Sequence, residues 1–106
     1  MAPVRVEDSS LFFGYSLDVH WERSTGDIDY IEFTSVERGS LADKAGLRAG
    51  DHLLEVDGKP ATGITQAEFV ALMSRDFTGG QTISYRFTVG RGFFFRRMDL
   101  VLRVRG

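Results

Sequence analysis

The stretch GSLADKAGLRAGDHLLEVDG, residues 39–58, contains most of the local signals that decide the fold. Ser40 is a residue type that caps helices, so a short helix is predicted over Leu41 to Lys44. Gly46 stands where a helix C-terminal glycine belongs, and Leu47 after it is expected to fold back onto the core. The Gly-Asp pair predicts a turn into the strand HLLEV, and the final Asp-Gly pair predicts a tight turn.

Segments on either side of this stretch also have the patterns of regular structure. Tyr15 to Val19 alternates apolar and polar side chains, and Tyr30 to Val36 is rich in β-branched and aromatic residues, so both predict strands. The polar segment HWERSTGDID between them predicts a hairpin loop. Thr65 to Ser74 predicts the longest helix, with Thr65 as its cap.

The C-terminal part predicts a two-stranded hairpin. After a Gly-Gly turn at 79–80, Thr82 to Val89 is the first strand and Gly90-Arg91-Gly92 is the connecting turn. The last strand alternates apolar and charged side chains, and its apolar face is predicted to carry Phe94, Met98, Leu100, Leu102 and Val104. Phe93 and Phe95 fall on the charged face. They either form a contact surface for another domain, a second copy or a membrane, or are buried because the hairpin curls over them.

The composition is that of one globular domain. The 106 residues are 42% apolar and 26% charged, and no cysteine is present, which excludes a disulfide framework and thiolate chemistry. The net charge of −2 gives the whole molecule no attraction to nucleic acid, although residues 91–106 carry five arginines against one aspartate. No apolar run is long enough to predict a membrane span, and the first ten residues lack an apolar signal core.

The sequence marks no reactive site. It has no G-x-S-x-G elbow, no P-loop and no dinucleotide-binding glycine motif. Neither of the two histidines, His20 and His52, has a second ligand at metal-binding spacing. We therefore expect no catalytic residue, no metal and no cofactor in this chain.

The order of these elements resembles a PDZ domain from Phe12 to Val89. The PDZ pattern is GSxA…AGLxxGDxILxVNG, and this chain has GSLA, AGL, GD, LLEV and DG in the same order. The resemblance implies an α+β, mostly β fold: a PDZ-like partly open barrel of five to six short strands with two helices. It also implies that residues 11–106 form the domain, with residues 1–10 as a flexible lead-in or a short first strand.

The resemblance implies a site for the C-terminal carboxylate of a peptide. Phe12, Phe13, Gly14 and Tyr15 stand where PDZ domains have the loop whose backbone N–H groups bind that carboxylate, as an anion nest does. The glycine lets the chain turn and the ligand approach closely. The family prefers glycine where this chain has Phe12, and Arg5 is the candidate for a basic residue upstream of the loop.

In PDZ domains the peptide adds as an antiparallel strand between the second strand and the long helix. The pairing strand would here be Ser16, Leu17, Asp18 and Val19, and the groove helix would contribute Gln66, Val70 and Met73. The pocket for the last side chain of the peptide would be lined by Phe13, Tyr15, Leu17, Val70 and Met73, which predicts a partner whose C-terminus ends in an apolar residue. Periodicity alone favours core packing for these five residues. Gln66 holds the selectivity position of the family, and glutamine can bond a hydroxyl or pack on an apolar side chain.

The pattern AGLRAGDHLLEVDG, with a basic strand at the end of the chain, looks more like bacterial PDZ domains than metazoan scaffold ones. Bacterial versions are commonly joined to proteases, so the resemblance implies a module of a larger bacterial protease or envelope protein, in the periplasm or the cytoplasm. The alternative is a structural or dimerising domain. It would contact a parent domain or a second copy through Phe93 and Phe95, without binding free peptide.

Overall fold

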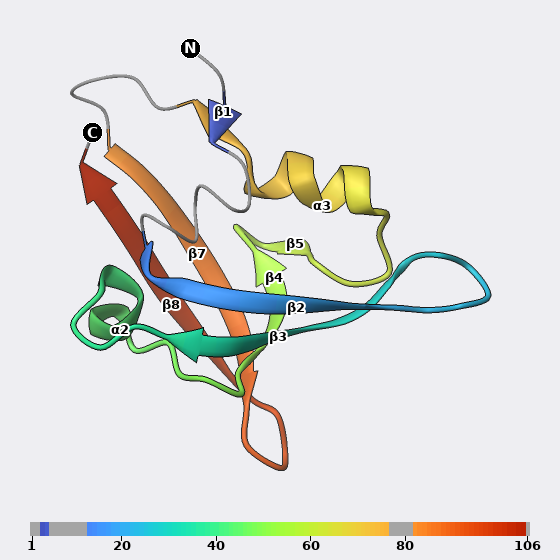
Figure 1. Cartoon of the computed structure of the whole chain (residues 1–106), viewed down its shortest axis with the longest axis horizontal. Coiled ribbons are helices and arrows are strands. Elements are labelled where there is room, and N and C mark those ends of the chain that lie inside the picture. Colours follow the sequence, from blue (N-terminus) through green and yellow to red (C-terminus); the bar gives the residue numbers. More distant parts are fainter. Residues whose placement is uncertain (1–2, 5–12, 77–81, 106) are drawn as a thin grey trace.

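The computed structural model describes residues 3–4, 13–76 and 82–105. In these ranges the chain forms a six-stranded antiparallel sheet, a separate two-stranded pair and two helices (Figure 1). The six strands are β2 (Tyr15–Trp21), β3 (Ile28–Val36), β4 (His52–Val56), β5 (Lys59–Pro60), β7 (Thr82–Arg91) and β8 (Arg96–Arg105). The helices are α2 (Leu41–Ala45) and α3 (Gln66–Met73). The predicted mostly β, PDZ-like fold is confirmed.

The strands of the main sheet follow the order β2-β3-β4-β7-β8, and β5 pairs with β4. Within the described ranges, this order puts β2 at one end of the sheet, with β3 as its neighbour on one side only. The separate pair joins β1 (Pro3–Val4) to β6 (Arg75–Asp76). The turn predicted at 79–80 lies outside the described residues, and the domain boundary at residue 11 stays a prediction.

Both predicted helices form, because their ends are capped as the sequence indicates. The Ser40 hydroxyl oxygen accepts a 3.1 Å hydrogen bond from the Asp43 N–H, and Gly46 ends α2 in the left-handed conformation with φ 100°. At α3, the Glu68 N–H donates to the Thr65 hydroxyl (3.2 Å), and the Thr65 N–H donates to the Glu68 carboxylate (3.0 Å). The hydrogen bonds that the Thr65 N–H and hydroxyl donate to the Glu68 carboxylate lower the pKa of Glu68.

The hairpin between β2 and β3 is longer than predicted. His20, Trp21 and Ile28, which the sequence placed in the loop, lie in the strands, and only residues 22–27 connect them. Two contacts explain the extension. The rings of His20 and Tyr30 stack at 4.0 Å between centroids, and the buried Ile28 donates its N–H to Ile64 O (2.8 Å).

The core is apolar and rich in aromatic rings. Its largest fully buried side chains are Tyr85, Phe13, Phe33, Phe87, Ile28, Ile31, Leu47, Leu53, Met73, Leu102, Val56 and Val89. Leu47 does fold back onto this core, as the sequence predicted. On β8, Leu100 and Leu102 face the core and Met98 packs partly against it, as the alternation predicted.

The prediction for Phe94 is wrong. Its side chain does not lie on the core face of the last strand and is almost fully exposed. The β8 strand begins only at Arg96, and Phe95 adopts a positive φ of 50° in the turn. A left-handed residue breaks the two-residue period, so the alternation read from the strand does not extend into the turn.

An ion pair between the half-buried Arg91 and the buried Asp51 fixes the base of the β7–β8 hairpin, and the sequence did not reveal it. Asp51 is buried, and its two carboxylate oxygens accept hydrogen bonds from Arg91 Nε (2.8 Å) and Nη2 (2.6 Å). Arg91 Nη2 also donates to Gly46 O (2.7 Å), and the Arg48 N–H donates to the same carboxylate (2.9 Å). The hydrogen bonds to Asp51 raise the pKa of Arg91. The pair therefore ties the hairpin to the loop after α2.

Candidate functional site

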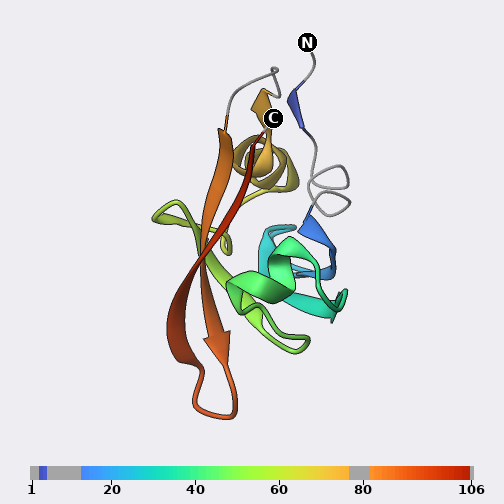
Figure 2. The same ribbon diagram turned by 90° about the vertical axis from the view of Figure 1, so that its left-hand side faces the viewer.

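The outer edge of β2 is the first feature of the candidate site. β3 pairs with β2 on one side, and α3 lies on the other side of β2 in both views (Figures 1 and 2). The register runs from Tyr15 opposite Val36 to Trp21 opposite Ile28. An outermost strand presents N–H and C=O groups that an added extended segment can pair with. The arrangement is that expected for a peptide lying between β2 and the long helix.

The turn at Gly14 leads into β2 and has the positive φ (82°) that only glycine adopts easily. Its carbonyl oxygen accepts a 2.8 Å hydrogen bond from the Glu37 N–H. A Cβ on Gly14 would lie 2.4 Å from the Cβ of Ser40. The missing side chain thus makes room for the start of α2. Phe12 and Arg5, the other residues considered for this loop, lie outside the described residues.

Three of the five predicted pocket residues, Phe13, Tyr15 and Met73, are buried in the core. The Phe13 ring packs edge-on against Tyr85, with centroids 5.6 Å apart. Tyr15 contacts two core rings in the same way, Phe33 at 5.2 Å and Phe87 at 5.9 Å. These side chains therefore form the floor beneath the β2–α3 region, as core packing from periodicity indicated.

The Tyr15 hydroxyl is unusual because it is buried and has no hydrogen-bond partner among the residues that the structure describes. Burial, assisted by the neighbouring Tyr85, raises the pKa of Tyr15 well above its ordinary value. The Tyr85 hydroxyl, in contrast, donates a hydrogen bond to Met73 O. A buried hydroxyl without a partner costs folding free energy, so the Tyr15 hydroxyl destabilises the folded chain at the start of β2.

The remaining predicted residues are accessible. Leu17 and Val19 are half-buried against the core, and Ser16 and Asp18 point to solvent on the same strand. On α3, Gln66 is exposed and Val70 exposes 38% of its surface, which is high for a branched apolar side chain. Leu17 and Val70 are therefore the apolar side chains that an added segment would touch first.

A hollow of about 360 Å³ lies beside the Gly14 turn, and the sequence did not indicate it. Its lining residues are Gly14, Glu37, Arg38, Gly39, Ser40, Leu41 and Lys44. Arg38 and Lys44 are both exposed there, one before α2 and one on it. With two cations against the one carboxylate of Glu37, the lining has a net positive charge, which favours an anion. The hydrogen bond from the Glu37 N–H to Gly14 O and the close approach of Gly14 to Ser40 bring these segments together.

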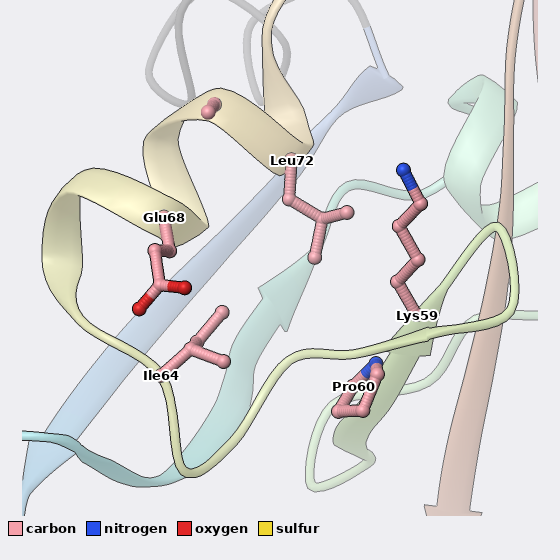
Figure 3. A pocket seen from close by; sticks show the side chains of 6 residues that line it. Lys59, Pro60, Ile64, Glu68 and Leu72 are labelled. Carbon is pink, nitrogen blue, oxygen red and sulfur yellow. The ribbon is translucent and has the colours of Figure 1, made fainter.

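A second hollow, of about 470 Å³, lies between α3 and β5 (Figure 3). Its lining residues are Lys59, Pro60, Ile64, Glu68, Ala71 and Leu72. These α3 residues differ from Gln66, Val70 and Met73, so this hollow is on another face of the helix from the predicted groove. It is not part of the candidate site.

Among residues 3–4, 13–76 and 82–105, no group of three or more His, Asp or Glu side chains is placed to hold a metal ion. In the same ranges, no helix combines the length and the apolar character needed to cross a membrane.

Comparison with known proteins indicates the family that this chain resembles. Residues 32–76 match the family model of the PDZ domain. Over 58 residues the chain is 43% identical to the Na(+)/H(+) exchange regulatory cofactor NHE-RF2 of Mus musculus, covering 55% of this chain and 16% of that protein. The structure resembles that of a photosystem II D1 C-terminal processing protease, with a TM-score of 0.54 and 21% identity over 89% of this chain and 23% of the other. At this identity the structural likeness is one of fold.

Residues 32–76 therefore match the PDZ domain, which is a non-catalytic module for protein interaction, and the described residues have a PDZ-like fold. The chain spans 16% of the length of the matched mouse protein and 23% of the length of the matched protease chain.

Proposed function

We propose that this domain binds extended C-terminal peptide segments by adding them as a strand to the outer edge of β2. The observation that supports this most is the position of β2 at the end of the sheet, with α3 alongside its outer edge. Main-chain hydrogen bonds along residues 16–19 would supply affinity that depends little on the peptide sequence. Affinity is expected to be about micromolar, since the flexible peptide must be ordered on binding.

The carboxylate of the peptide would sit at the turn from Phe13 to Tyr15. The positive φ of Gly14 supports a local reversal of the chain there, of the kind that groups N–H donors. Arg38 and Lys44 in the adjoining hollow add positive charge, which favours a carboxylate through the electrostatic potential. Gly14 also has a packing role against Ser40, so its replacement would disturb the fold together with the site.

The last side chain of the peptide is expected to be apolar. The half-buried Leu17 and the exposed Val70 offer the accessible apolar contacts. The buried Phe13, Tyr15 and Met73 lie beneath them. Met73 is flexible enough to accommodate different shapes, which favours a tolerant pocket. Gln66 at the start of α3 would contact the residue two positions before the C-terminus of the peptide and help to select it.

The test is a binding screen with peptides that have free C-termini, each compared with its C-terminally amidated form by fluorescence anisotropy. Val70→Glu is expected to weaken binding by about 2 kcal/mol or more, roughly thirtyfold, because a charge would enter the apolar contact. Ala71→Glu is the matched control, since it adds the same charge to an exposed position on the other face of α3. That variant should bind as the unchanged chain does.

Two results would contradict parts of the proposal. Equal binding of free and amidated peptides would exclude recognition of the carboxylate and leave internal strand addition. Absence of binding to every peptide would exclude the function itself.

The domain is further proposed to be one module of a larger protein, such as a bacterial protease or envelope protein. The small share that it covers of both matched proteins supports a modular role. In such a protein the domain would present substrate or partner tails to another domain. Any catalytic activity would belong to that other domain.

A further inference from the structure

The tip of the β7–β8 hairpin exposes two phenylalanine rings to solvent. Phe93 and Phe94 have 90% and 89% of their surface exposed. Their rings contact each other edge-on, with centroids 5.1 Å apart. In both views the hairpin projects beyond the rest of the molecule (Figures 1 and 2). Two adjacent exposed rings on a projecting turn form an apolar tip for which packing within the domain gives no reason.

The tip is held in this position by contacts at its base. Phe95 folds back with a φ of 50°, and its ring packs edge-on against His52, with centroids 5.0 Å apart. A Cβ on Gly90 would lie 2.9 Å from the Phe95 ring, so the glycine makes room for it. Arg91 is tied to the buried Asp51. One ring and one ion pair therefore anchor the turn while Phe93 and Phe94 face outwards.

The hairpin that carries this tip is strongly basic. Residues 82–105 contain one acidic residue, Asp99, against six arginines: Arg86, Arg91, Arg96, Arg97, Arg103 and Arg105. The chain as a whole has a net charge of −2, so the remainder of the molecule is acidic. Arg96 is exposed directly beside the tip, and the exposed Arg97 is paired with Glu55 at 3.0 Å. Near the tip, Arg91 and Arg97 are each paired with a carboxylate, so Arg96 supplies the positive charge closest to the rings. Arg103 lies toward the other end of the ribbon, opposite Ser84, and adds to the charge of the hairpin as a whole.

We propose that Phe93 and Phe94 insert into the interfacial layer of an anionic lipid membrane, with the neighbouring arginines at the level of the headgroups. A narrow convex tip can enter a soft lipid interface, where aromatic rings and arginines are both favoured. Anionic lipids attract basic segments that lie close to the membrane surface. A two-fold contact with a second copy would bring the arginines of the two hairpins together, which like charges disfavour.

Membrane contact at this tip would leave the candidate peptide site accessible. The tip lies at one end of the β7–β8 ribbon, and α3 lies toward the other end (Figure 1). The proposal does not depend on peptide binding, because it rests on the exposed rings and the charge of the hairpin alone.

Co-sedimentation of the 106-residue chain with lipid vesicles tests the proposal. The chain is expected to bind phosphatidylcholine vesicles that contain phosphatidylserine, and to bind pure phosphatidylcholine vesicles much more weakly. The double variant Phe93→Ser/Phe94→Ser should lower the partition coefficient at least about tenfold, because each ring loses its burial in lipid. Arg96→Ala should lower it about fivefold. Val101→Ser is the matched control, since it removes an exposed apolar side chain of β8 away from the tip, and it should change nothing.

Insertion can also be observed without removing the rings. Trp21 is the one tryptophan, so Phe94→Trp in a Trp21→Phe background places the only indole at the tip. Its emission should shift to the blue, and brominated lipids should quench it, only with anionic vesicles. The proposal is overturned if the unchanged chain binds no vesicle, or if the Phe93→Ser/Phe94→Ser variant binds as well as the unchanged chain. A dimer in sedimentation velocity that the same double variant abolishes would also overturn it, in favour of a second copy as the occupant.

Discussion

At the scale of single residues, Tyr15 combines a good environment for its ring with a poor one for its hydroxyl. The ring packs edge-on against Phe33 and Phe87, and no described residue forms a hydrogen bond with the buried hydroxyl oxygen. Tyr15→Phe keeps the ring contacts and removes the unsatisfied group. We expect the free energy of unfolding to rise by about 1 kcal/mol, measured by urea denaturation near pH 7.

The raised pKa of Tyr15 also gives the stability a dependence on alkaline pH. The folded chain holds the phenol proton more tightly than the unfolded chain, whose tyrosines ionise near pH 10. Stability due to this group is therefore complete below pH 10 and is lost as the pH rises above it, by up to about 1.4 kcal/mol per pH unit. Tyr15→Phe should make the decline above pH 10 less steep. An unchanged slope would mean that the phenol ionises equally in both states.

At the scale of elements, the Asp51–Arg91 pair joins the loop after α2 to the β7–β8 hairpin. Arg91→Ala would leave a buried carboxylate without its cation, so we expect a loss of about 3 kcal/mol in the free energy of unfolding. Arg97→Ala is the control, because its partner Glu55 and its own side chain are both accessible to solvent, and it should cost less than about 1 kcal/mol. Equal losses in the two variants, measured by thermal or urea unfolding, would contradict the structural role of the buried pair.

At the scale of the whole molecule, the two proposed contacts use separate parts of the fold. The peptide would bind along β2 and α3, and the membrane would meet the turn between β7 and β8 (Figures 1 and 2). We therefore expect them to be independent. Phe93→Ser/Phe94→Ser should leave peptide affinity unchanged, and Val70→Glu should leave vesicle binding unchanged. A loss of peptide affinity in the tip variant, measured by anisotropy without lipid, would show that the two sites are coupled.

The sequence by itself determined the elements whose signals are local. Ser40 and Gly46 delimit α2, and Thr65 with Glu68 starts α3, because capping bonds join residues only a few positions apart. The resemblance of this order to a PDZ domain implied the fold, a turn of the chain at Gly14 and the strand that has an open edge. The run of residues 39–58 therefore specified its own structure almost completely.

Only the tertiary structure decided which side chains the chain covers and which it exposes. Alternation places Phe13 and Tyr15 on one face of a strand, but the rings brought over them by β3 and β7 turn that face into core. The contact of Gly14 with Ser40, and that of Asp51 with Arg91, join residues 26 and 40 positions apart, and local patterns contain no information about such pairs. Phe94 faces solvent because Phe95 takes a left-handed conformation to pack on Gly90 and His52. The conformation of Phe95 depends on the packing surface formed by Gly90 and His52, and that surface exists only once the sheet has assembled.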